Sequence, residues 1–149
     1  MKKAPPMEKP RTLLIVEDEI LPAISLKSGL EDAGYQVMDL TSRPEEAMAA
    51  ARECKPDLAL VNIKLYGRND GIALAVELKA IGVPVLFISG QPNRAVSARS
   101  VAVGSLAKPY SVDDMVQAVA YLLARLAGDA SQPCPKDLQV FDEDLPKVA

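Results

Sequence analysis

The chain has 149 residues, of which 49% are hydrophobic and 25% charged, and its formal net charge is −3. The composition is ordinary for a globular protein, and the acidic balance argues against nucleic-acid binding, which requires a basic surface. The sequence contains no histidine, which excludes imidazole catalysis and histidine-ligated zinc, and Cys54 and Cys134 form no metal or disulfide pattern. No apolar run reaches the roughly 18 residues of a membrane-spanning helix. With no signal peptide either, we expect a cytoplasmic protein without membrane contact.

Composition divides the chain into three parts. Residues 1–11 are rich in proline and lysine and are expected to form a flexible arm. Residues 12–127 alternate apolar runs with amphipathic stretches, which predicts one folded domain. Residues 128–149 combine three prolines with many charged residues, which predicts a disordered tail. Within that tail, residues 138–145 are a candidate docking segment.

Five apolar runs with strand character alternate with five helical stretches. The strands are expected at residues 12–16, 35–40, 58–61, 83–88 and 103–107. The helices are expected at residues 19–33, 42–54, 72–81, 93–101 and 111–126, with capping boxes at Ser42–Glu45 and Ser111–Asp114. This alternation implies right-handed crossovers and predicts an α/β fold with a doubly wound, five-stranded parallel sheet.

Polar residues follow three of these strands at their carboxyl ends. Glu17-Asp18-Glu19 follows the first strand, Asn62 ends the third, and Ser89-Gly90 follows the fourth. Since the carboxyl ends of parallel strands lie along one edge of a sheet, these residues predict a site at that edge. Asn62 is at its centre and is neutral where the surrounding chemistry would favour a carboxylate.

The order of these features resembles the receiver domain of two-component response regulators, the CheY-like family, over residues 12–126. Each landmark is weak alone, but five in the right order at strand ends are specific. They are Glu17-Asp18, Pro56-Asp57, Asp70-Gly71, Ser89-Gly90 and Lys108-Pro109. The resemblance implies the flavodoxin-like strand order 2-1-3-4-5.

The resemblance implies a Mg²⁺ site and a phosphoacceptor. Glu17, Asp18, the residue at position 62 and the backbone carbonyl of Lys64 would supply oxygen ligands, which this hard cation prefers. An aspartate at position 62 would take the phosphoryl group from a phosphohistidine of a partner kinase, because a carboxylate is a competent nucleophile.

The residues implied to respond to phosphorylation lie after the last two strands. Ser89 would follow the phosphoryl group, Lys108 would neutralise it, and Pro109 would follow a cis peptide bond. Ser105 stands where the family usually has an aromatic switch residue, so coupling to the last helix is expected to differ or be absent. The loop after Asn62 is one residue longer than usual, with Tyr66 near where proline is common.

Asn62 is the main departure from the family pattern. An amide cannot form an acyl phosphate, so phosphotransfer at this residue is predicted not to occur, and the lost negative charge weakens the Mg²⁺ site. We expect an inactive arrangement, since no phosphoryl group draws Ser89 and Lys108 inward. Two origins stay open: a natural degenerate receiver, or a working receiver whose aspartate was replaced.

The predicted function is that of a single-domain receiver in phosphorelay signalling that acts by protein–protein interaction and is not an enzyme. Only the segment 128–149 follows the last helix, which is too short for a DNA-binding module. The expected partners are a histidine kinase or phosphotransfer protein, and a second copy bound through the fourth helix, fifth strand and fifth helix. Two alternatives are a flavodoxin-like protein that binds a small ligand or nucleotide near Asn62 and Lys108, and a scaffold that acts through the tail. The first lacks a Gly-rich phosphate loop.

Overall fold

The computed structural model describes residues 10–66, 68, 70–141, 145 and 146. The strands in this part of the chain are β1 (Thr12–Val16), β2 (Gln36–Thr41), β3 (Leu58–Asn62), β4 (Val85–Ser89), β5 (Gly104–Ala107) and β6 (Leu138–Val140). The helices are α1 (Ile20–Asp32), α2 (Pro44–Glu53), α3 (Asp70–Ala80), α4 (Pro92–Ser97) and α5 (Val112–Leu126). A 3₁₀ turn, η1 (Arg99–Val101), lies between α4 and β5.

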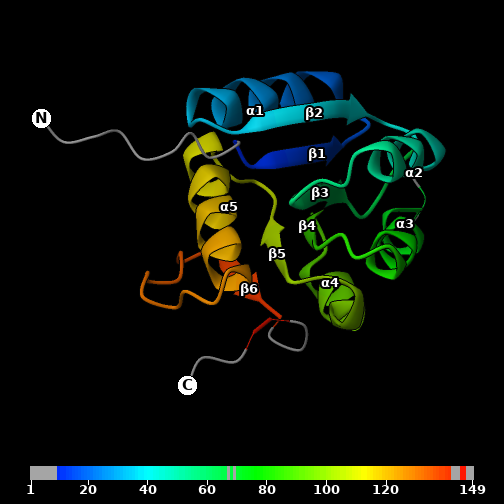
Figure 1. Ribbon diagram of the computed structural model, residues 1–149. Coiled ribbons are helices and arrows are strands. Elements are labelled where there is room, and N and C mark those ends of the chain that lie inside the picture. Colours follow the sequence, from blue (N-terminus) through cyan, green and yellow to red (C-terminus); the bar gives the residue numbers. More distant parts are fainter. Residues whose placement is uncertain (1–9, 67, 69, 142–144, 147–149) are drawn as a thin grey trace, which may run out of the picture.

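The strands form one sheet in the order β2-β1-β3-β4-β5-β6. The first five pair in parallel, which confirms the predicted order 2-1-3-4-5 and the doubly wound α/β fold. β6 pairs antiparallel with β5 and is a sixth strand that the sequence did not predict. Figure 1 shows the helices on both faces of the sheet, and β6 beside β5 below α5.

One apolar cluster fills each face of the sheet. On one face, α1 and α5 bury Leu26, Leu30 and Leu122. On the other face, α2, α3 and α4 pack mainly small residues and Leu74 onto the strands. Because both faces are covered, every residue of β3 and β4 is buried, which explains why these strands are continuous apolar runs.

The helix starts agree only in part with the predicted capping boxes. Ser111 and Asp114 form the predicted box at the start of α5. The box predicted at Ser42 is wrong, because α2 begins at Pro44 and no side chain caps it. Thr41, rather than Ser42, makes the side-chain hydrogen bonds near this helix start. Its Oγ1 accepts a hydrogen bond from the Arg43 backbone N–H at 3.2 Å and donates one to Glu46 at 3.0 Å. The fourth helix is also shorter than the predicted range 93–101, since α4 ends at Ser97.

The predicted disordered tail is wrong for residues 138–141. Leu138–Val140 forms β6, and the backbone N–H of Phe141 donates to the Val103 carbonyl at 2.9 Å. Leu138, Phe141 and Leu145 are all buried. Composition predicts disorder from the prolines and charges, whereas three apolar side chains and an open β5 edge determine the structure here. Of the candidate docking segment 138–145, residues 142–144 lie outside the described residues.

The predicted flexible arm, residues 1–11, lies largely outside the described residues. At its end, the carbonyl of Arg11 accepts a hydrogen bond from the Gln36 backbone N–H at 2.9 Å. Among the residues that the structure describes, no helix combines the length and apolar character needed to cross a bilayer.

Candidate functional site

Four parallel strands bring the candidate residues to one edge of the sheet. β1 ends just before Glu17, β3 ends at Asn62, β4 ends at Ser89, and β5 ends just before Lys108. The strand register places these ends side by side, and the backbone N–H of Lys108 donates to the Ser89 carbonyl at 2.8 Å. A cleft of about 380 Å³ opens there and is lined by Asp18, Glu19, Asn62, Ile63, Lys64, Ser89, Gly90, Gln91 and Lys108.

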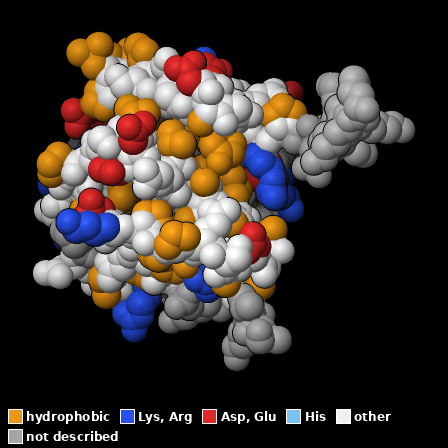
Figure 2. All heavy atoms as spheres, turned by 90° about the vertical axis from the view of Figure 1, so that its left-hand side faces the viewer, with side chains coloured by type: hydrophobic (Ala, Val, Ile, Leu, Met, Phe, Trp, Pro, Cys, Tyr) orange, Lys and Arg blue, Asp and Glu red, His pale blue; other side chains and the backbone are white. Residues whose placement is uncertain are grey.

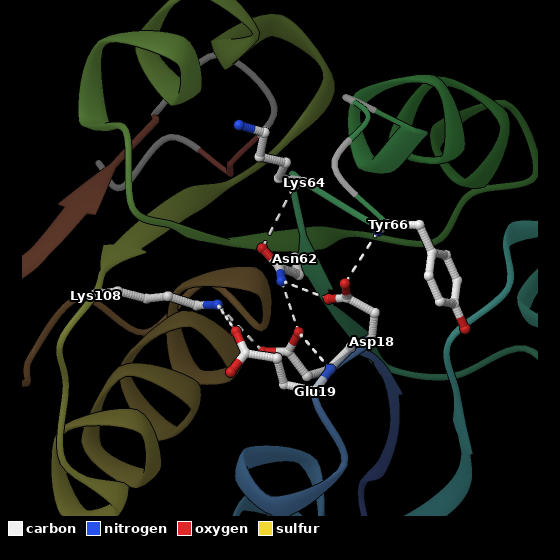
Figure 3. A network of polar contacts seen from close by, with 7 residues as sticks. Asp18, Glu19, Asn62, Lys64, Tyr66 and Lys108 are labelled. Carbon is white, nitrogen blue, oxygen red and sulfur yellow. Dashed lines mark hydrogen bonds and ion pairs between the residues drawn. The ribbon is translucent and has the colours of Figure 1, made fainter.

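Asn62 is the centre of the polar network. Its side chain is 4% exposed, and its amide Nδ2 donates to Glu17 Oε2 at 2.6 Å and to Asp18 Oδ1 at 3.2 Å. Its Oδ1 accepts from the backbone N–H of Lys64 at 3.4 Å. Figure 3 shows the amide nitrogen between the carboxylates, with the oxygen directed towards Lys64. Both protons of one amide group therefore bridge the two acids.

Lys108 supplies the positive charge of the site. Its Nζ lies 3.4 Å from Glu17 Oε1 and 3.6 Å from Glu19 Oε1. Figure 3 shows the lysine side chain extending towards Glu19. Glu17 Oε1 is buried and has no hydrogen-bond partner among the described residues. The ion pair with Lys108 is thus the main compensation for the burial of that oxygen.

The two acids differ in their affinity for protons. Burial raises the pKa of Glu17, and the hydrogen bond from Asn62 and the charge of Lys108 offset this only in part. Burial also acts to raise the pKa of Asp18, but the hydrogen bond from the Tyr66 backbone N–H leads the effects that outweigh it, and the pKa is lowered. Asp18 therefore holds the more stable negative charge, and Glu17 depends on its neighbours to stay ionised.

Tyr66 contacts the site, although the sequence analysis placed it only in a loop that is one residue longer than usual. Its backbone has φ 52°, in the left-handed region that non-glycine residues seldom adopt. This conformation lets its N–H donate to Asp18 Oδ2 at 3.0 Å, while its hydroxyl donates to Ser42 Oγ at 2.5 Å. The lengthened loop therefore contacts the site through a backbone donor, which no residue pattern could have predicted.

Gly71, at the start of α3, packs directly against the backbone of Asn62 and Ile63. A Cβ on Gly71 would lie 2.1 Å from the Asn62 carbonyl oxygen and 2.7 Å from Ile63 Cα. The Gly71 N–H donates to the Ile63 carbonyl at 3.0 Å. The start of α3 can approach the end of β3 this closely only with glycine at this position.

The residues expected to respond to phosphorylation are placed as follows. The Ser89 hydroxyl donates to the Gln91 carbonyl at 2.9 Å and accepts from the Gln91 N–H at 2.8 Å, so its hydrogen bonds stay within its own turn. Ser105 is buried in β5, opposite Phe87 of β4. The Lys108–Pro109 peptide bond is cis, as the resemblance implies. Among the contacts of the described residues, Ser89 and Lys108 have other partners than Asn62, and the inactive arrangement stays a prediction.

The Mg²⁺ ion implied by the resemblance does not fit this arrangement. A cation needs oxygen ligands, yet Asn62 presents its N–H₂ group to both carboxylates. Asp18 accepts a second hydrogen bond from Tyr66, and Glu17 is paired with Lys108. Among the described residues there is also no group of three or more acidic, histidine or cysteine side chains that could hold a metal. The charges of Glu17 and Asp18 are thus already compensated by N–H donors and an ammonium group.

Comparison with known proteins identifies the family to which this fold belongs. The family described as response regulator receiver domain matches residues 13–120. The chain is 31% identical over 120 residues to the transcriptional regulatory protein PdtaR of Mycobacterium tuberculosis, covering 78% of this chain and 58% of that protein. It is 38% identical over 84 residues to the phyllosphere-induced regulator PhyR of Methylorubrum extorquens, covering 55% of this chain and 32% of that protein. The chain thus spans less than two thirds of the length of these relatives.

Solved structures show the same fold. The signal receiver domain of a modulated diguanylate cyclase from Desulfovibrio desulfuricans G20 is 34% identical, with a TM-score of 0.68, covering 77% of this chain and 94% of that chain. A response regulator from Chloroflexus aurantiacus J-10-fl is 30% identical, with a TM-score of 0.69, covering 78% of this chain and 100% of that chain. Both alignments leave part of this chain unmatched.

Proposed function

Because the chain belongs to the response regulator receiver domain family of two-component systems, we propose that it is a receiver that does not accept a phosphoryl group at Asn62 and acts through protein–protein contacts. Receiver domains and the related regulators generally act as signalling proteins rather than as enzymes. We accordingly assign no catalysed reaction to this chain. Its site serves to hold one conformation of the strand ends.

The contacts of the Asn62 amide carry this proposal. Phosphoryl transfer requires a nucleophilic oxygen at the end of β3. The amide nitrogen has its lone pair delocalised into the carbonyl group, and it donates to Glu17 and Asp18. The amide oxygen carries no full negative charge and accepts from Lys64. Neither atom of this amide is therefore available as a phosphoryl acceptor.

The same contacts support weakened metal binding. Receiver domains generally bind Mg²⁺ at this acidic site. In this chain a cation would have to displace the Asn62 N–H₂ group from both acids and compete with Lys108. We infer that the amide and the ammonium neutralise Glu17 and Asp18 in place of a metal. The site is then complete without phosphate or Mg²⁺.

An apolar surface beside the site supports a helical protein partner. Receiver domains interact with kinases or phosphotransfer proteins. On the outer side of α1, Ile20, Leu21 and Ile24 are 70%, 74% and 51% exposed. Figure 2 shows hydrophobic side chains protruding at the top of the molecule, where α1 lies. Exposed large apolar residues next to a site are typical of protein interfaces.

A second cleft extends this surface towards α5. It has a volume of about 490 Å³ and lies between α1 and the loop that joins β5 to α5, where Pro22, Leu26, Tyr110 and Val112 line it. Lys108 and Glu19 border both this cleft and the polar one. A helix of a kinase or phosphotransfer protein that packs on α1 would thus lie against the Lys108–Glu19 pair. Such binding needs no phosphoryl transfer.

A phosphotransfer assay tests the proposal. The chain and its Asn62→Asp variant are incubated with Mg²⁺ and a small phosphoryl donor such as phosphoramidate, and the intact mass is measured. We expect the chain to stay unmodified and the aspartate variant to gain one acid-stable, hydroxylamine-labile phosphoryl group. Hydroxylamine distinguishes an acyl phosphate from a phosphoserine. A hydroxylamine-labile phosphoryl group on the unaltered chain would contradict the proposal.

The small-ligand alternative has little support in the cleft. Asp18 and Glu19 line the space that a phosphate-bearing ligand would enter, and both would repel it. Of the two lysines that line the cleft, Lys64 and Lys108, the second is paired with Glu17 and Glu19. Purified protein is expected to contain no bound flavin or nucleotide. The test is to denature the protein and to examine the supernatant for released ligand by absorbance spectroscopy and mass spectrometry.

A further inference from the structure

Two donors hold the Asp18 carboxylate, one on each of its oxygens. Asn62 Nδ2 donates to Oδ1 at 3.2 Å, and the Tyr66 backbone N–H donates to Oδ2 at 3.0 Å. Asn62→Asp would remove the first donor, whereas the second belongs to the backbone and would stay. A cation that takes Asp18 as an oxygen ligand therefore competes with Tyr66, whatever residue occupies position 62.

The backbone of Tyr66 adopts a conformation that its neighbours must enforce. Its φ of 52° lies in the left-handed region, which costs free energy in a residue with a Cβ and persists only where surrounding contacts hold it. The preceding residue, Leu65, is fully buried and exchanges two backbone hydrogen bonds with Arg68, at 2.8 and 3.0 Å. These contacts hold the turn from the side of the core.

The phenol of Tyr66 holds the same turn from the side of the solvent. The side chain is 60% exposed, and its hydroxyl donates to Ser42 Oγ at 2.5 Å. Ser42 directly follows β2, whose last residue, Thr41, accepts a hydrogen bond from the Glu17 backbone N–H at 3.0 Å. Figure 3 shows the Tyr66 backbone facing Asp18, while the ring extends away from that carboxylate. Tyr66 thus links the loop after β3 to the ends of β1 and β2.

We propose that Tyr66 is a positioning residue. The hydrogen bond from its hydroxyl to Ser42, the anchor, keeps its backbone N–H on Asp18 and thereby opposes cation binding at this acid. A cation that draws Asp18 towards itself displaces the Tyr66 N–H, and the anchor resists that movement. By linkage, whatever stabilises the cation-free arrangement weakens cation binding by the same factor. This role rests on the proposed function, in which N–H donors neutralise the acids in place of a metal.

Three substitutions isolate the anchor. Tyr66→Phe removes the hydroxyl and keeps the ring and the backbone N–H. Ser42→Ala removes the other partner of the same hydrogen bond and leaves Tyr66 unaltered. Tyr35→Phe is the matched control, because it removes a phenol hydroxyl next to the opposite end of β2.

Hydrogen exchange of the backbone amide at position 66, followed by NMR, tests the positioning while Asn62 is still present. We expect this amide to exchange about two- to tenfold faster in Tyr66→Phe and in Ser42→Ala, the factor by which one net neutral hydrogen bond shifts an equilibrium. The unaltered chain and Tyr35→Phe should exchange at the same rate. Circular dichroism checks that each variant is folded.

Calorimetric titration with MgCl₂ tests the effect on cation binding in the Asn62→Asp background. We expect the added substitution Tyr66→Phe or Ser42→Ala to tighten Mg²⁺ binding by about two- to tenfold relative to Asn62→Asp alone. Added Tyr35→Phe should leave the affinity unchanged. Binding that appears only once the anchor is removed would support the proposal as well.

Two results overturn the proposal. One is an amide at position 66 that exchanges at the same rate with and without the anchor, because the hydroxyl would then not hold the N–H on Asp18. The other is that neither substitution tightens Mg²⁺ binding to Asn62→Asp, whether that binding is measurable or absent throughout. Both results leave the proposed function standing, since that function fails on a different observation, namely Mg²⁺ binding or phosphorylation of the chain that retains Asn62.

Discussion

Asn62→Asp is expected to destabilise the folded chain when no divalent cation is present. The substitution removes the hydrogen bond from Nδ2 to Glu17 Oε2 at 2.6 Å and the one to Asp18 Oδ1 at 3.2 Å. It also places a third carboxylate against these two acids. Glu17, Asp18 and the new aspartate then share one nearby ammonium group, that of Lys108, which also pairs with Glu19.

The size of the effect follows from these contacts. A hydrogen bond to a charged group contributes about 1.5–3 kcal/mol, and the bond to buried Glu17 dominates because Asp18 is more exposed. Two like charges near 4 Å repel by about 4 kcal/mol at an effective dielectric constant of 20. Lys108 and partial protonation offset part of this repulsion. We therefore expect the free energy of unfolding to fall by about 3–5 kcal/mol at pH 7.5.

The pH dependence has a definite sign. Burial already raises the pKa of Glu17, and a third carboxylate raises the pKa values of the group further. An acid whose pKa is raised by folding favours the folded state below its unfolded pKa and opposes it above its folded pKa. The destabilisation by Asn62→Asp should therefore be largest at neutral pH and decrease as the pH falls towards about 4, the unfolded carboxyl pKa.

Urea unfolding at pH 7.5 and pH 5, with and without MgCl₂, measures these effects. Asn62→Ala is the matched control, since it removes the hydrogen bonds without adding charge. Mg²⁺ should stabilise the aspartate variant by about 2.7 kcal/mol at one hundred times its dissociation constant and leave the alanine variant unchanged. If Asn62→Asp is as stable as the unaltered chain at pH 7.5 without Mg²⁺, the amide bridge does not neutralise the acids and our reasoning is refuted.

Three further predictions concern residues around the site. Lys108→Met should lower the free energy of unfolding by about 1–3 kcal/mol in urea denaturation, because it leaves the buried Glu17 oxygen uncompensated; an unchanged midpoint would contradict the ion pair's role. Burial and the nearby carboxylates raise the pKa of Tyr110 to about 12, so a 295 nm titration of the chain minus that of Tyr110→Phe should show this phenol ionising near that pH. Since folding raises this pKa, the associated stability should decline as the pH rises above about 10. Gly71→Ala should cost about 3 kcal/mol or more by thermal or urea unfolding, whereas Gly90→Ala, with nothing within 4 Å of its added Cβ, should be neutral; equal effects would show that the close approach to Asn62 is relaxed.

Residue pattern predicted the sheet because its strands are buried on both faces. Such strands are apolar throughout, so Leu58–Val61 is recognisable without its neighbours. The meeting of Glu17, Asn62 and Lys108 also followed from the sequence, since topology alone brings the carboxyl ends of parallel strands together. What Asn62 does there was predicted only as a loss of acceptor chemistry.

The bridging role of Asn62 depends on geometry that no pattern encodes. It requires the amide to turn its nitrogen to the acids, and Asp18 to be held from the other side by the Tyr66 backbone at φ 52°. The C-terminal segment was mispredicted for a related reason. Prolines and charges dominate its composition, while Leu138 and Phe141 gain their burial from a β5 edge that exists only in the folded sheet.

The central claim is that the side-chain amide of Asn62 takes the place of a metal ion between Glu17 and Asp18. The most direct test is a Mg²⁺ titration that follows the two Asn62 side-chain N–H resonances by ¹⁵N NMR, assigned by their loss in Asn62→Asp. We predict two distinct resonances that exchange slowly with solvent and do not shift at millimolar Mg²⁺. Two results would contradict the claim. One is a pair of resonances with the chemical shifts and fast solvent exchange of exposed side-chain amides, and the other is a pair that shifts and saturates as Mg²⁺ is added.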